Sequence, residues 1–126
     1  MTLRNLFIIN TVLPLVFGVA LVLAPASLVS LYGGTLGEFG IVTGRLLGGA
    51  FLGYAVLSWF ARNAEDSEVQ RAIVLALFIT NAIGFIVSLL ARISGVGNPL
   101  SWSNVVLYLL LALGFGYFQF VKPAAS

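Results

Sequence analysis

The sequence predicts an all-α integral membrane protein, folded over residues 1–126 as a single antiparallel four-helix bundle. Of its 126 residues, 60% are hydrophobic and only 8% carry a charge, whereas about a quarter of the residues of a soluble domain are charged. The apolar residues form four continuous runs, each close to the roughly 20 residues that a helix needs to cross a bilayer. Short connections between the runs favour antiparallel neighbours, and the runs lack the alternation of a membrane β-barrel.

The four spans are expected at about residues 6–24, 41–60, 72–90 and 105–121. The first run is longer than the roughly 7–15 apolar residues of a signal peptide. We therefore expect it to stay in the protein as a helix, although small residues around Pro25 offer a cleavage pattern. Pro14, in the middle of this run, is expected to kink the helix because it removes one backbone hydrogen bond.

The basic residues predict how the spans are oriented. Four of them fall on the side that would hold both termini, namely Arg4, Arg62, Arg71 and Lys122. Only Arg45 and Arg92 fall on the other side. Because Lys and Arg concentrate in cytoplasmic loops, this distribution predicts that both termini are cytoplasmic.

The connections also carry recognisable signals. Residues 25–34 predict a short amphipathic turn at the outer interface, with Pro25 suited to a first helical position and Gly33 to a C-terminal stop; an irregular loop is the alternative. The connection after the second span is expected to be a solvated turn with Asn63 or Asp66 as a helix cap. Residues 95–99 predict a turn, after which Ser101 or Ser103 would cap the fourth helix.

Small residues repeat every four positions in the second and third spans. The second span carries Gly40, Gly44 and Gly48, with Gly49 and Gly53 beside them, and the third carries Ala72, Ala76, Thr80, Gly84 and Ser88. In lipid, such residues let helices approach closely. We expect these two ridges to pack on each other within one molecule, with a homo-oligomeric contact as the alternative.

A few polar residues within the apolar spans are candidates for a binding site. Glu38, Arg45, Asn81 and Tyr108 could line an outward-opening cavity between the second, third and fourth helices. Such a cavity would suit a lipid, a quinone-like molecule or an anionic headgroup. In the alternative interpretation, Arg45 extends to the outer headgroups, and Asn81, Tyr108 and Asn10 make hydrogen bonds between helices.

The residue types that are absent exclude most chemistry. Cys and His do not occur, so the chain offers no thiolate nucleophile, disulfide, His base, or His/Cys metal site. No carboxylate lies within a span, which argues against a proton-driven pump. We expect a protein that is not an enzyme, has no cofactor or metal, and has no nucleic-acid partner.

Several short motifs resemble those of small bacterial four-helix membrane proteins grouped with the DoxX-like families. They are an early Asn in the first span, Ala24-Pro25, Leu31-Tyr32-Gly33, and the Arg-Leu-Leu-Gly of residues 45–48. The resemblance implies the four-helix architecture and a bacterial inner membrane. DoxX is associated with membrane redox complexes, but no redox residue of this chain corresponds.

Two functions remain open. The first is an accessory or structural protein that packs through its glycine faces, either on itself or on a larger membrane complex. The second is a binding protein for a lipid or quinone-like ligand. Outward-pointing glycines would favour assembly, and inward-pointing glycines would leave room for packing or for a cavity.

Overall fold

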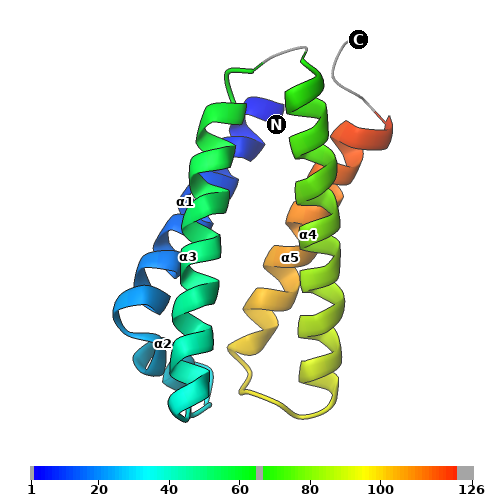
Figure 1. The fold of residues 1–126 in the computed structure, drawn as a ribbon. Helices are drawn as coiled ribbons and strands as arrows, with labels where there is room; N and C mark the ends of the chain where they lie inside the picture. The colour runs from blue at the N-terminus through cyan, green and yellow to red at the C-terminus, as the bar shows by residue number, and fades with distance from the viewer. Residues whose placement is uncertain (1, 65–66, 122–126) are drawn as a thin grey trace.

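The computed structural model describes residues 2–64 and 67–121, and these residues form helices and connections without a strand. The helices are α1 (Leu3–Leu23), α2 (Pro25–Leu31), α3 (Glu38–Ala61), α4 (Glu68–Ile93) and α5 (Ser101–Gly116), which continues into a π-helical turn, η1 (Tyr117–Val121) (Figure 1). Helices α1, α3, α4 and α5 with η1 are long and apolar enough to cross a membrane. The predicted helical class is therefore confirmed for these residues.

Each predicted span coincides with a long helix to within a few residues, although the first extends one residue past α1 and the fourth continues from α5 into η1. Helix α4 begins four residues before the apolar run, where the Ser67 hydroxyl accepts a hydrogen bond of 2.9 Å from the Gln70 backbone N–H. Ser67, and not Asn63, is the cap, and Asp66 lies outside the described residues, as does Lys122. The predicted serine cap of the last helix is wrong, because α5 follows Leu100 without any side-chain cap.

The two remaining connections contain proline and glycine at the positions where the sequence predicts turns. Helix α2 is present, with Pro25 in its first turn, and the chain leaves it through Gly33 at a φ of 81°. The turn between α4 and α5 contains Gly95 and Gly97 at φ values of 86° and 83°. These left-handed conformations cost glycine little and other residues much more.

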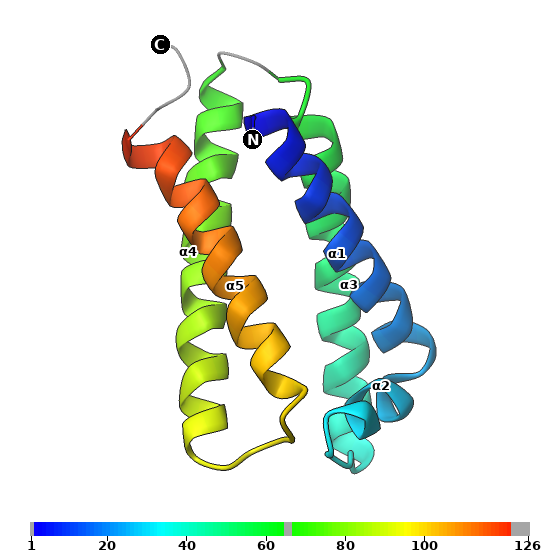
Figure 2. The ribbon, with the colours of Figure 1, turned by 180° about the vertical axis from the view of Figure 1, so that it is seen from behind.

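The long helices form two antiparallel pairs, α1 with α3 and α4 with α5 (Figures 1 and 2). The predicted packing of the second span on the third is therefore wrong. Each of the two ridges meets another partner. Gly48 of α3 faces α1, where an added Cβ would lie 2.8 Å from the Gly18 carbonyl oxygen. Gly84 of α4 faces α5, where an added Cβ would lie 2.5 Å from the Tyr108 ring.

The other predicted packing glycines of α3 lie farther from neighbouring helices than Gly48 does. At Gly44 an added Cβ would lie 3.2 Å from Pro25 Cβ, which is a close contact with α2. Gly49 and Gly53 are exposed, and nothing in the described chain lies within 4 Å of a Cβ added at either. Helix α3 thus has one glycine face turned toward α1 and another that no described residue covers.

The two pairs join at the end of the molecule where α1 begins. A buried apolar cluster lies there, made of Leu6, Phe7, Ala61, Val74, Leu77, Leu111 and Phe115. The Phe7 and Phe115 rings are fully buried, with centroids 5.7 Å apart. Gln70 of α4 also donates a hydrogen bond of 2.9 Å to the carbonyl of Ala61 in α3. We call this region the joined end.

At the opposite end, hydrogen bonds link the segment around α2 to the α4–α5 side. The Tyr32 hydroxyl donates to Asn104 Oδ1 at 3.2 Å, and Asn98 Nδ2 donates to the Leu31 carbonyl at 2.9 Å. We call this region the cavity end, because a cavity separates the two helix pairs between it and the joined end.

Candidate functional site

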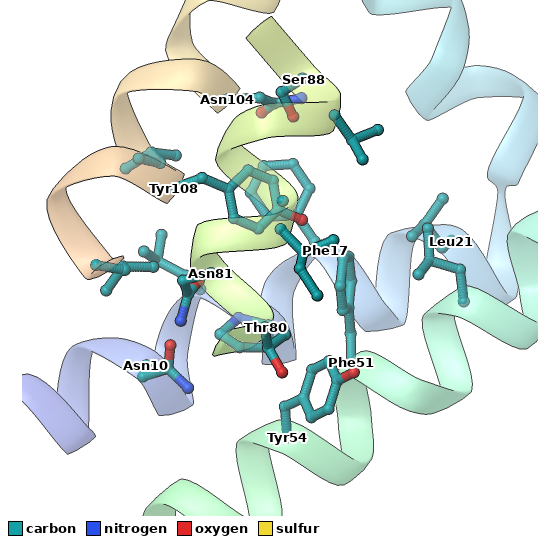
Figure 3. A pocket seen from close by; sticks show the side chains of 18 of the residues that line it. Asn10, Phe17, Leu21, Phe51, Tyr54, Thr80, Asn81, Ser88, Asn104 and Tyr108 are labelled. Carbon is teal, nitrogen blue, oxygen red and sulfur yellow. The ribbon is translucent and has the colours of Figure 1, made fainter. Parts of the chain in front are cut away.

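A cavity of about 470 Å³ lies between the α1–α3 pair and the α4–α5 pair (Figure 3). All five α-helices contribute to its wall. Its volume lies within the roughly 300–1,000 Å³ of pockets that hold small molecules. The cavity results from the pairing described above, because the pairs meet at the joined end and leave space between them beyond it.

The wall on the α1–α3 side is mostly apolar. It is formed by Leu13, Pro14, Phe17 and Leu21 of α1 and by Leu47 and Phe51 of α3. Phe17, Leu21 and Phe51 are seen around the cavity in Figure 3. Tyr54 and Asn10 are the polar side chains on this side, and the Tyr54 ring lies 6.1 Å from that of Phe51.

The wall on the α4–α5 side carries most of the polar groups. Thr80, Asn81 and Ser88 come from α4 and Asn104 and Tyr108 from α5. Positions 80, 84 and 88 share one face of α4 because they are four residues apart. Gly84, the middle position, lets the Tyr108 ring lie directly against α4. The result is a strip of hydroxyl and amide groups along an otherwise apolar cavity.

Several of these polar groups have unused hydrogen-bonding capacity. Asn81 is 5% exposed, and its Nδ2 donates to the Leu77 carbonyl of its own helix at 2.8 Å. Within residues 2–64 and 67–121, nothing donates to Asn81 Oδ1, and the Tyr108 and Tyr54 hydroxyls have no hydrogen-bond partner. A polar group in an apolar setting favours a partner, so the cavity suits an occupant with polar atoms of its own.

The predicted hydrogen bonds between helices have mixed outcomes. For Asn10 the prediction is confirmed, because its Nδ2 donates to the Ser58 hydroxyl of α3 at 2.8 Å and both residues are buried. For Asn81 it is wrong, since the donor binds its own helix. Tyr108 packs its ring on Gly84 and makes no such bond to any described residue.

The structure brings together two of the four predicted ligand residues. Asn81 and Tyr108 line the cavity, whereas Glu38 and Arg45 are exposed on α3 and do not. No ion pair joins Glu38 or Arg45 to another residue of the described chain. None of the described residues that line the cavity is charged.

A smaller pocket of about 220 Å³ adjoins the cavity at the cavity end, and Arg92 lines it. Sequence analysis treated Arg92 only as a charge near a helix end. It did not assign Tyr54, Ser88 or Asn104 to the binding site, although it named Ser88 as a small residue of the third span. A signal for Arg92 was present, because it continues the four-residue ridge of α4 one step beyond Ser88. The described residues hold no cluster of three or more acidic, Cys or His residues that could hold a metal ion.

Comparison with known proteins identifies the family. The model of a domain of unknown function, DUF8292, matches residues 1–120, so the chain belongs to this family. Neither the curated proteins nor the solved structures contain a match to the chain.

Proposed function

We propose that this member of the DUF8292 family is an integral membrane protein that binds a lipophilic small molecule, such as a lipid or a quinone-like compound. The observation that carries the proposal is the cavity between the helix pairs, where Asn81 Oδ1 and the Tyr108 hydroxyl lie unpartnered in an apolar wall. The apolar surface would exclude water from the bound molecule. The few polar groups would orient it, as is usual for small-molecule sites.

The proposal includes a placement in the membrane. The four long helices would form a bundle across a bacterial inner membrane, with both termini in the cytoplasm. Arg4, Arg62 and Arg71 lie toward the joined end, and Arg45 and Arg92 lie toward the cavity end. With Lys122 counted from the sequence, the positive-inside rule supports a cytoplasmic joined end.

We propose binding without catalysis. The described residues around the cavity are apolar side chains, amides, hydroxyls and phenols, and none of them is a carboxylate that could activate a hydroxyl. A general base with a pKa near neutrality is the usual requirement for nucleophilic or acid–base chemistry. The polar groups present are suited to recognition.

Native mass spectrometry of the protein, extracted gently from its own membrane, tests the proposal. We expect one chain with an extra mass of about a few hundred daltons, the size that such a cavity accommodates. Asn81→Leu should lose the extra mass, because it removes the acceptor and places branched carbon in the cavity. Arg45→Ala should keep it, because Arg45 is exposed and outside the cavity. A bare wild-type chain, or equal retention by Asn81→Leu, would overturn the proposal.

A second candidate function is that of an accessory protein that assembles through helix α3, on itself or on a larger membrane complex. The specific observation is the exposed face of Gly49 and Gly53, where no described residue lies within 4 Å of an added Cβ. In lipid, a neighbouring helix could approach such a face closely. Gly49→Leu and Gly53→Leu should then lower the mass of the native complex on a gel. Unchanged migration would count against assembly through this face.

A further inference from the structure

We propose that the ligand is an acidic amphiphile, with a single apolar chain in the large cavity and an anionic headgroup bound by Arg92 in the smaller pocket. This inference rests on the proposed function, because it assigns the chemistry of the molecule that the cavity binds. It adds a residue, Arg92, and a headgroup charge that the large cavity alone does not indicate.

The two pockets adjoin each other. Val29, Tyr32, Ser88 and Asn104 line both of them. On α4, the face that lines the large cavity leads to the smaller pocket in one helical turn, because Arg92 follows Ser88 by four residues. A molecule in the cavity would reach Arg92 by passing the side chains of Tyr32 and Asn104, which are joined by a hydrogen bond of 3.2 Å.

Arg92 lacks the acceptors that a guanidinium group requires. Its Nε is buried and donates to nothing in the described chain, and one terminal nitrogen donates to the Gly97 carbonyl at a long 3.3 Å. No described carboxylate forms an ion pair with it. An unpaired buried donor is costly, and carboxylate and phosphate groups match the guanidinium geometry best.

A second arginine, Arg62, makes a closer contact with a tryptophan than Arg92 does. Arg62 lies with Cζ 3.5 Å from the centroid of the Trp59 ring and donates to the Trp59 carbonyl at 2.5 Å. Arg92 also has a tryptophan beside it, but the Trp102 centroid is 6.0 Å from its Cζ, at the outer limit of a cation–π contact. Arg92 therefore makes the weaker of the two tryptophan contacts, and its buried Nε has no acceptor among the described residues.

The dimensions of the large cavity favour one chain of one leaflet. Along α4 the cavity runs from Ser88 to Leu77, and eleven residues at about 1.5 Å each span about 16 Å. This length is about half of the roughly 30 Å hydrocarbon core, which is the depth of one leaflet. A headgroup above such a chain would stand at the level of Arg92, near the end of α4.

Binding measurements on the full chain in a nonionic detergent test the proposal, with oleate and oleyl alcohol as probes. The two probes share one chain and differ in headgroup charge. We expect the wild-type protein to bind oleate about tenfold more tightly, since a hydrogen bond to a charged group is worth at least that factor. Arg92→Gln should remove this preference and keep the affinity for the alcohol. Arg45→Gln, which removes the same charge at an exposed site, should keep the preference.

The outcomes separate the inference from the proposed function. If neither probe binds the wild-type protein, both fail. If both probes bind equally and Arg92→Gln changes nothing, the proposed function stands and the inference is overturned. If inorganic phosphate alone displaces oleate fully, the pocket is a site for a free anion and the inference is again overturned. Should Arg92→Gln not fold, Arg92→Lys decides, because it keeps the charge and should keep part of the preference for oleate.

Discussion

The joined end and the cavity end connect the same two helix pairs by different means. At the joined end, buried apolar side chains from all four long helices meet, with the Phe7 and Phe115 rings fully enclosed. At the cavity end, the hydrogen bonds of Tyr32 and Asn98 bridge the two sides around empty space. The pairs can therefore separate more easily at the cavity end than at the joined end.

The energies of apolar packing and of single hydrogen bonds support this difference between the two ends. A buried aromatic side chain makes many close contacts at once, so its loss leaves a large void. A hydrogen bond between neutral groups contributes only about 0.5–1.5 kcal/mol. Opening the cavity end should therefore cost much less than separating the pairs at the joined end.

The largest effect is expected from Phe7→Ala. The change leaves a void beside Phe115 and should lower the free energy of unfolding by up to about 3–5 kcal/mol, the range for such changes in soluble cores. Thermal unfolding in detergent measures it. Phe39→Ala is the matched control, because Phe39 is 88% exposed. Equal loss in both variants would show that the joined end is not the main attachment.

An intermediate effect is expected within the α1–α3 pair. Gly48→Ala places a Cβ 2.8 Å from the Gly18 carbonyl oxygen and 2.9 Å from Leu21 Cβ. The backbones must then move apart, at a cost of about 1–3 kcal/mol. Gly49→Ala, one residue along the same helix, meets open space and should be neutral or slightly stabilising. Similar unfolding temperatures for the two variants would contradict the pairing of α3 with α1.

The smallest effect on stability is expected from Tyr32→Phe. It removes the hydroxyl that donates to Asn104 at 3.2 Å and should cost about 1 kcal/mol or less. Because this contact lies where the two pockets meet, the variant should exchange a bound lipid faster, as followed by native mass spectrometry over time. Tyr117→Phe changes an exposed tyrosine at the joined end and is the control. Unchanged exchange would mean that the Tyr32 contact does not limit access.

The long helices could be predicted from the sequence because continuous apolar runs have few other interpretations. Their bounds were less accurate, since hydropathy marks the apolar part of a helix and α4 begins with the polar residues Glu68, Gln70 and Arg71. The pairing could not be predicted. Small residues at four-residue spacing show that a helix can be approached closely, but they do not identify the helix that approaches.

The candidate site was predictable to a similar degree. Asn81 and Tyr108 were found because a polar group deep in an apolar run must be accommodated. Glu38 and Arg45 were grouped with them on the expectation that α3 packs on α4. Helix α3 pairs with α1 instead, and it lines the cavity through Leu47, Phe51 and Tyr54, whereas Glu38 and Arg45 are exposed outside it. The resemblance to DoxX-like families, which bears on the same architecture, stays a prediction.

The order of pairing along the chain has a consequence for biosynthesis. Helices α1 and α3 belong to the first half of the chain and α4 and α5 to the second, so each pair forms between neighbours in synthesis. The first pair can enter the bilayer and pack before the second has left the ribosome. The cavity has no wall on the α4–α5 side until the second pair docks. If the chain inserts into a bilayer and binds a lipid as proposed, lipid would surround the cavity at the moment when it is enclosed, and the first ligand could be acquired during assembly.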